Sequence, residues 1–497
     1  MKNVKLALLA GVAVIGSVGL GGSANAQSAN QAIYSGGGTL ASKVYRQLFD
    51  CWGVAITTPA VNCSSATGNT SAGTVQILYA PVGSGAGKRA FANHESGINN
   101  AANGLGTPAA TNTVPYVSSD FPAYPYLDFH FAGSDDVLTA TDVALYNSNS
   151  GPTKYGAILQ IPAFSTTVTI PFNAKDGNGN DLTIVNATPT GGSSGLNLSR
   201  KALCGIFTGH ITKWNNPILT ALNGGTPLGS GQITVVHRSD GSGTTFLTTN
   251  ALTAQCAGVF GPNNETDPTP ALYEFNYTDR GTSTAQCNVA IPVHGANAIN
   301  WPDLGNDQCG QPIAPRNSGG GTYLGASGSG GVVSTVTSTP GAIGYVSPDF
   351  VQPVVPTGLA AANLESQYDI DNSTGAFQAP TAGGSATAMQ AANPTFDDTS
   401  IQNPINWSRQ GVVPNPLLAG SYPISGFTWF DMYQCYKAAD LTAIQAYVTY
   451  HYSDAGAQSI LNANGFAVIP SNWLSAVSTL LFSSASAMGN CGIYAGQ

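Results

Sequence analysis

Three stretches of the chain repeat one pattern of apolar and polar positions. In each, a short apolar run typical of a buried strand ends in a glycine-rich turn, and a segment with helical spacing follows. Strand, glycine-rich turn and helix are the unit of an open α/β sheet, whose ligands bind at the carboxyl ends of the strands. We therefore expect the three turns to converge on one cleft. The turns cover residues 36–38, 83–87 and 241–243.

The third turn carries the most specific chemistry. The apolar run 233–236 leads into Arg238 and Asp240, and the turn at 241–243 then opens a helix at Thr244. Free N–H groups at a helix start, beside a hydroxyl and a guanidinium, form a pocket for a tetrahedral oxyanion such as phosphate. A surface ion pair between Arg238 and Asp240 is the alternative that the residues leave open.

Two adjacent carboxylates follow another strand-like run. An aromatic strand at 129–131 ends in a small-residue turn, and Asp135 and Asp136 come next. Phosphate near neutral pH still carries a proton and sulfate does not, so a buried carboxylate accepts a hydrogen bond from phosphate and repels sulfate. A carboxylate at this turn would therefore select phosphate. A solvated cap is the alternative, and the pattern leaves open which of the two carboxylates faces the ligand.

Outside these turns the pattern is less regular. Segments 157–161 and 167–171 are strand-like and could cross between domains. The stretch 441–452 has the spacing of an amphipathic helix. Residues 351–418 are rich in Ala, Pro, Asn and Thr and show little periodicity. This composition indicates extended loops or a decorated insertion, and not a separate catalytic domain.

Length and charge limit the class of protein. A chain of 497 residues is too long for one ordinary core and predicts two or more domains. Only 8% of the residues are charged, and the net charge is −9 without a basic patch, which argues against nucleic acid as a partner. An anion site in this chain must therefore act locally, through backbone N–H groups and one or two cations.

Residues 1–26 have the form of a secretory signal peptide. Lys2 and Lys5 give a positive start, 6–20 is apolar, and small residues at 24–26 form a cleavage site. The mature protein is then expected in the periplasm, with secretion from the cell or a place on its surface as alternatives. A retained membrane anchor is the other interpretation, and the short, glycine-broken apolar stretch argues against it.

The eight cysteines agree with export, because an even number without a CxxC pair favours disulfides over metal ligation. Spacing does not determine which cysteines pair. The simplest hypothesis joins each cysteine to the next one along the chain, because each disulfide loop then stays local. The hypothetical pairs are Cys51–Cys63, Cys204–Cys256, Cys287–Cys309 and Cys435–Cys491.

The six histidines are scattered along the chain, so no metal site and no cofactor is expected.

Together these motifs resemble the periplasmic phosphate-binding proteins of bacterial ABC importers, including their DING-type branch. The matching pieces occur in family order from residue 33 to beyond 424, which is most of the predicted mature chain. The most specific of them is Arg-x-Asp-Gly-Ser-Gly-Thr at 238–244. The pieces are 36–40, 83–87, 132–135, 206–214, 238–244, 340–346 and 422–424.

The resemblance implies an α/β fold of the type II periplasmic binding protein class, with two α/β domains around a hinged ligand cleft. It places 27–170 together with 420–497 in domain I, and 171–419 in domain II. The chain is longer than typical members of the family. Insertions without an assigned role lie near 100–130, 262–316 and 350–420.

The same resemblance implies a set of phosphate ligands and no catalytic residue. Domain I would supply N–H and hydroxyl groups together with the carboxylate of Asp135. Arg238 would close the site from domain II, held in place by Asp240. Leu40 stands where the family usually has Phe, a harmless change if only its backbone is used. The implied ligands are Thr39, Leu40, Ser84, Asp135, Arg238, Ser242, Gly243 and Thr244.

The leading hypothesis is therefore a monomeric, exported binder of inorganic phosphate that delivers it to a membrane ABC permease and is not an enzyme. One alternative is an exported phosphatase-like hydrolase that uses the same oxyanion pocket; it would need a nucleophile or a metal pair nearby, and the sequence shows neither. The others are a binder of another oxyanion, such as sulfate, molybdate or a sugar phosphate, and an adhesive surface protein that has kept the fold.

Overall fold

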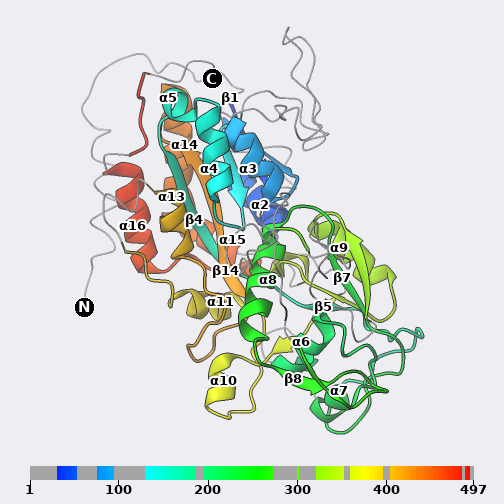
Figure 1. Ribbon diagram of the computed structural model, residues 1–497. Helices are drawn as coiled ribbons and strands as arrows, with labels where there is room; N and C mark the ends of the chain where they lie inside the picture. The colour runs from blue at the N-terminus through cyan, green and yellow to red at the C-terminus, as the bar shows by residue number, and fades with distance from the viewer. Residues whose placement is uncertain are drawn as a thin grey trace, which may run out of the picture.

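The computed structural model forms two lobes, each built around a five-stranded sheet (Figure 1). The predicted signal peptide at 1–26 lies outside the described residues, as does most of the insertion near 100–130. The described residues are 31–52, 75–93, 129–185, 195–273, 275, 299–301, 321–351, 359–395, 403–483 and 487–492.

The first sheet is mixed and has the order β2-β1-β3-β14-β4. Strand β1 is parallel to β2 and β3, and β14 is antiparallel to β3 and β4. All 9 residues of β14 are buried, because the strand lies inside the sheet and helices cover it. The strands are β1 Gln31–Gly37, β2 Val75–Pro81, β3 Phe131–Ser134, β4 Ile158–Thr167 and β14 Ser425–Tyr433.

Helices cover the first sheet, with α3 against β1 and β3 and α16 against β4. Local sequence explains where α4 begins: the Thr139 hydroxyl accepts the N–H of Asp142, and the Asp142 carboxylate accepts the N–H of Thr139. In α2, Val44 and Leu48 are fully buried, in agreement with their helical spacing. The helices are α2 Ser42–Cys51, α3 Ser84–Asn93, α4 Ala140–Ser148, α5 Gly151–Tyr155, α14 Ala438–Ser453, α15 Ala455–Ala463 and α16 Ser471–Phe482.

The second sheet has the order β10-β7-β11-β5-β12. Strand β7 is parallel to β10 and β11, and β5 is antiparallel to β11 and β12. The strands are β5 Pro171–Phe172, β7 Thr234–Arg238, β10 Thr322–Ala326, β11 Ala342–Gly344 and β12 Ala360–Ala361. The helices of this lobe include α6 Arg200–Phe207, α7 Pro217–Leu222, α8 Gly243–Gln255 and α9 Gly328–Ser338. Two small sheets pair β6 Asn197–Leu198 with β13 Asn363–Leu364 and β8 Phe260–Pro262 with β9 Pro270–Leu272.

All three predicted strand–turn–helix units are present, as β1 with α2, β2 with α3 and β7 with α8. The segment 167–171 also crosses as expected, because it leaves the first sheet at the end of β4 and enters the second at β5. Within it, the N–H of Val168 donates to the carbonyl of Ile424 at 2.8 Å and the N–H of Thr169 to that of Val346 at 2.7 Å. This crossing therefore ties the two sheets together.

The expectation of extended loops over 351–418 was wrong for much of that region. Helix α11 packs against β4 and β14, and β12 extends the second sheet. The α11 sequence is almost entirely small residues, so it shows no helical periodicity, yet small side chains let a helix approach a sheet closely. Thr381 caps it by accepting the N–H of Gly384 at 3.0 Å. The helices of this region include α10 Gln367–Asp371, α11 Ala382–Met389 and α13 Pro404–Arg409.

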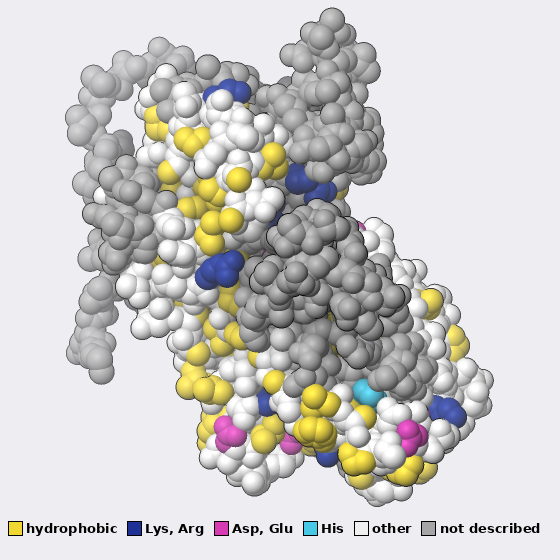
Figure 2. Space-filling view, in the orientation of Figure 1, with side chains coloured by type: hydrophobic (Ala, Val, Ile, Leu, Met, Phe, Trp, Pro, Cys, Tyr) yellow, Lys and Arg dark blue, Asp and Glu magenta, His cyan; other side chains and the backbone are white. Residues whose placement is uncertain are grey.

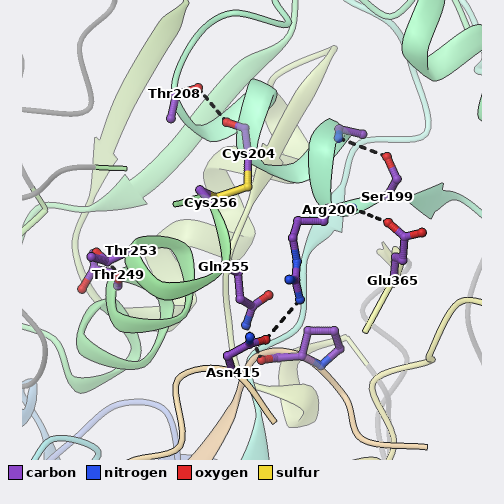
Figure 3. Close-up of a disulfide and its surroundings, with 12 residues drawn as sticks. Ser199, Arg200, Cys204, Thr208, Thr249, Thr253, Gln255, Cys256, Glu365 and Asn415 are labelled. Carbon is purple, nitrogen blue, oxygen red and sulfur yellow. Dashed lines mark hydrogen bonds between the residues drawn. A yellow bond between two sulfur atoms is a disulfide. The ribbon is translucent and has the colours of Figure 1, made fainter. Parts of the chain in front are cut away.

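Two of the four hypothetical disulfides are confirmed. They are Cys204–Cys256, which joins α6 to the end of α8 (Figure 3), and Cys435–Cys491. Cys51 is also disulfide-bonded. The other cysteines of the two remaining hypothetical pairs lie outside the described residues.

Candidate oxyanion-binding site

The charged groups of greatest interest are buried, whereas the face of the molecule in Figure 2 carries few charged side chains, scattered singly. Arg238 and Asp135 are each 2% exposed, and Lys88 is 3% exposed. Burying an ion costs free energy unless it is paired and hydrogen-bonded. Each of these groups therefore needs a protein partner or a bound ligand.

The hydroxyl of Ser84 links the two lobes at the carboxyl ends of their strands. Ser84 begins α3, directly after β2, and its Oγ accepts the N–H of Asp135 at 3.1 Å and the N–H of Gly243 at 3.2 Å. The same hydroxyl donates to Asp135 Oδ2 at 3.4 Å. The turns after β2, β3 and β7 therefore meet at Ser84, and those after β2 and β7 are two of the three turns that the sequence pattern predicts to converge.

Arg238 is clamped by the carboxylate two residues later. Its Nε donates to Asp240 Oδ1 at 2.6 Å, and its Nη2 pairs with Asp240 Oδ2. Arg238 is buried, so a surface ion pair does not describe the arrangement. Gly83 faces Asp240 from the first lobe with φ +97°, and a Cβ there would lie 2.9 Å from Asp240 Oδ2. Only glycine fits that close approach.

The N-terminus of α8 points its first residues at the same place. Ser242 caps the helix by accepting the N–H of Thr245 at 3.2 Å. A Cβ on Gly243 would lie 2.5 Å from the Cβ of Asp135 and 2.6 Å from Ser84 Oγ, so the start of α8 is in close contact with Asp135 and Ser84. The buried hydroxyl of Thr244 has no hydrogen-bond partner among the described residues. An anion at this helix end would accept its hydrogen bond and gain from the helix dipole.

The turn after β1 forms the remaining side of the site. A Cβ on Gly38 would lie 2.9 Å from Asp135 Oδ2. The hydroxyl of Thr39 lies 3.1 Å from that of Ser329 in the second lobe and accepts the Ser329 N–H at 3.2 Å. Leu40 is fully buried and belongs to the hydrophobic core.

The two adjacent carboxylates have different surroundings. Burial, followed by the charge of Asp136, raises the pKa of Asp135 to about 8, although Arg238 and Ser84 act in the opposite direction. Asp136 is instead paired with Lys88, which also donates to Asp142 at 3.0 Å. Asp135 is therefore the carboxylate beside Ser84 and Gly243, and neither carboxylate is a solvated cap, since both are buried.

Sequence reasoning missed the turn after β10. Gly328 donates its N–H to Asp240 Oδ1 at 2.9 Å, and Ser329 contacts Thr39 across the lobes. The same strand, glycine-rich turn and helix pattern is present at 322–338 and would have indicated this turn. Tyr345 was missed as well; its hydroxyl accepts the N–H of Arg238 at 3.0 Å.

The site combines donors from both lobes with one buried carboxyl group, Asp135, whose pKa is raised by burial. Hydroxyls, a guanidinium and a helix N-terminus bind oxyanions, and the carboxyl recognises a proton on the ligand. Within the described ranges, no group of three or more His, Cys, Asp or Glu side chains is arranged to hold a metal ion. No helix in those ranges is long and apolar enough to cross a bilayer.

Comparison with known proteins places the chain in a family. Residues 66–455 match the PBP superfamily domain. A phosphate-binding protein from an unknown prokaryotic organism is 30% identical over 436 residues, which cover 84% of this chain and 92% of that protein. Alkaline phosphatase L from Pseudomonas aeruginosa is 29% identical over 419 residues, covering 84% of this chain and 85% of that protein.

A solved structure is similar over nearly the whole chain. It is a high affinity periplasmic phosphate-binding protein (PfluDING) bound with phosphate, with a TM-score of 0.57 and 25% identity, covering 93% of this chain and 98% of that one. The similarity confirms the expected fold, two α/β lobes of the periplasmic binding protein type. The chain therefore belongs to the family of periplasmic phosphate-binding proteins, within the PBP superfamily.

Proposed function

We propose that the protein binds inorganic phosphate between its two lobes without chemically changing it. The observation that carries the proposal is the convergence of turns from both sheets on Ser84, Asp135 and Gly243. We propose the ligand set implied by the family resemblance. It comprises Thr39, Leu40, Ser84 and Asp135 from domain I (27–170 with 420–497), and Arg238, Ser242, Gly243 and Thr244 from domain II (171–419), with Asp240 orienting Arg238.

Selectivity in this proposal rests on one proton. Burial raises the pKa of Asp135 to about 8 and so disfavours a bare negative charge there. Phosphate brings a proton that the two groups can share, whereas sulfate brings only charge. The ionised carboxylate of Asp135 accepts a hydrogen bond from that phosphate proton, but it meets sulfate as a like charge, which weakens sulfate binding.

A hydrolase is the rival function, and the Pseudomonas aeruginosa relative named alkaline phosphatase L is the observation that favours it. Hydrolysis would need a nucleophile free to attack phosphorus. The hydroxyl of Ser84 already accepts two backbone N–H groups, which makes its oxygen a poorer nucleophile. Turnover of p-nitrophenyl phosphate by the wild-type protein, abolished in Arg238→Ala, would favour the hydrolase.

The wider role follows from family membership. We propose that residues 1–26 direct export and are removed, and that the mature protein acts as a monomer in the periplasm. There it would hand phosphate to a membrane ABC permease. Secretion or attachment at the cell surface is the alternative location, which mass spectrometry of the mature N-terminus and cell fractionation would distinguish.

The test is calorimetric titration of the mature, ligand-stripped protein with phosphate and with sulfate. We expect micromolar or tighter phosphate binding and no sulfate response. Arg238→Ala should weaken phosphate binding by at least about a hundredfold, because it removes a buried charge partner of the anion. Asp135→Asn should bind phosphate more weakly and lose part of the discrimination against sulfate.

Arg409→Ala is the matched control, because Arg409 lies on an exposed part of α13 far along the chain from the site. It should bind phosphate as the wild type does. A folded wild-type protein that shows no heat with phosphate would refute the proposed function.

A further inference from the structure

The segment 299–301 lies against the candidate site, although it belongs to the insertion near 262–316, which has no assigned role. The carbonyl of Ile299 accepts the N–H of Ser242 at 2.8 Å. Ser242 is the capping residue of α8 and directly precedes Gly243 and Thr244. The segment 299–301 therefore helps to set the position of the N-terminus of α8.

The side chain of Ile299 contacts both lobes at once. Its Cδ1 lies 3.1 Å from the point that a Cβ on Gly85 would occupy, and 3.2 Å from the corresponding point on Gly241. These two glycines meet where the turn after β2 approaches the turn after β7, with the Gly85 N–H 3.5 Å from the Gly241 carbonyl. Ile299 thus covers the seam between the lobes, at the point where Gly85 adjoins Ser84 and Gly241 adjoins Ser242.

A cavity of about 280 Å³ adjoins Ile299 and is lined also by Gly85 and by side chains of α3 and α4. Gly85 is also a residue of the seam, so the cavity reaches the line along which the lobes meet, and the Ile299 side chain forms part of its wall there. Shortening that side chain would enlarge the cavity beside the contact between Gly85 and Gly241.

Trp301 attaches this segment to the second lobe. It is 5% exposed, and its ring stacks on His237, with centroids 5.3 Å apart, and on Tyr345, with centroids 5.6 Å apart. His237 precedes Arg238 in β7, and Tyr345 accepts the Arg238 N–H. An anchor on these rings makes the segment move with the second lobe, so Ile299 reaches Gly85 only when the lobes are together.

We propose that Ile299, in the segment 299–301, is a positioning residue that clasps the two lobes over bound phosphate. The proposal rests on the proposed phosphate binding. Because the contact with Gly85 exists only when the lobes are closed, Ile299 stabilises the bound state more than the open one. Its loss should therefore weaken binding and speed release without a matching loss of stability in the ligand-free protein.

The experiment measures phosphate affinity by calorimetry, phosphate dissociation by stopped flow and the melting temperature of the ligand-free protein. Ile299→Ala should weaken affinity about tenfold, mainly through faster dissociation, because the apolar contact across the seam is lost. Ile299→Val removes only Cδ1 and should give an intermediate effect of about threefold. Ile218→Ala is the matched control, since Ile218 is a partly buried isoleucine of α7 outside the seam.

The outcomes separate the two proposals. If the wild type binds no phosphate, the proposed function fails and the clasp fails with it. If the wild type binds and both Ile299 variants keep its affinity and dissociation rate, only the clasp is refuted. The clasp would also be refuted if the Ile299 variants bound phosphate as the wild type does and only their ligand-free melting temperature fell, because Ile299 would then have a purely structural role. If Ile299→Ala does not fold, Ile299→Val still tests the same Cδ1 contact.

Discussion

At the scale of single residues, position in the fold separates carboxylates that look alike in the sequence. Asp135 and Asp136 are neighbours and both are buried, yet among the described residues Asp136 forms a direct ion pair, with Lys88, whereas Asp135 has only the more distant charge of Arg238. Burial lowers the pKa of Lys88, but Asp136 and Asp142 raise it to a value above that of a free lysine. Lys88 therefore stays charged behind the site and leaves Asp135 as the carboxyl available to a ligand.

Asp431 provides a pH-dependent test of burial. Its Oδ1 accepts a hydrogen bond from Gln160 at 2.6 Å, its Oδ2 has no partner among the described residues, and burial raises its pKa to about 8. An unfolded aspartate has a pKa of about 3.9. Between that pH and about pH 8, Asp431 therefore keeps a proton in the folded state that it has lost in the unfolded state. The stability linked to this proton is present at low pH and is lost as pH rises toward the folded pKa.

We therefore expect the wild type to become less stable from pH 6.5 to pH 8.5, and Asp431→Asn to remove part of that loss. The free energy of unfolding should fall more steeply with pH in the wild type than in the variant, by about 1.4 kcal/mol per pH unit at most. His451, whose pKa burial lowers to about 4, stays neutral throughout this window and does not interfere. Denaturant unfolding of both proteins at the two pH values measures the effect, and parallel pH dependences would contradict it.

At the scale of elements, α8 connects the site to the interior of the second lobe. Its N-terminus carries Gly243 and Thr244, and Cys256 at its other end is bonded to Cys204 of α6. Figure 3 shows this disulfide beside Gln255, near Arg200 and Asn415. The disulfide fixes the end of α8 that is remote from Gly243 and Thr244, so its role should be stability and not ligand contact.

The double variant Cys204→Ala, Cys256→Ala should therefore lose stability and keep its affinity for phosphate. The expected cost is about 2–5 kcal/mol in the free energy of unfolding, because the link constrains the unfolded chain. Denaturant unfolding and calorimetry of the same preparation measure the two quantities. A loss of affinity greater than about tenfold, equal to about 1.4 kcal/mol, would show that the disulfide also positions the helix N-terminus.

The elements also show where sequence patterns stop being informative. The three glycine-rich turns were predictable because turn chemistry and helix capping act within a few residues. Helix α11 was not, because its small side chains leave no apolar stripe and only packing on β4 and β14 makes it a helix. The turn at Gly328 had the same local signal as the other three and could have been recognised.

At the scale of the whole molecule, the contacts across the lobes describe a closed cleft. Ser84 reaches Gly243, and Thr39 reaches Ser329, both through hydrogen bonds between the two sheets' turns. Polar groups of both lobes meet at these two contacts, so an anion bound among them should stabilise the closed form. Phosphate should then shift the population toward the closed form.

We expect the radius of gyration measured by small-angle X-ray scattering to fall when phosphate saturates the ligand-stripped protein. Arg238→Ala at the same phosphate concentration should show a smaller fall or none, because the variant lacks the guanidinium that draws the second lobe to the anion. Sulfate serves as the control for ionic strength. An unchanged radius in the wild type under saturating phosphate would mean that the cleft is closed without its ligand.

The sequence by itself determined the local features of this protein: the strand–turn–helix units, the motif around Arg238, and the chemistry of an oxyanion site. These depend on neighbouring residues, because capping, glycine turns and short apolar runs act over a few positions. Only the tertiary structure decided which carboxylate lies in the site, how Ser84 joins the lobes, and that Ile299 lies over the seam. Burial, pKa and contact between segments far apart in the chain arise from packing, and no local pattern records them.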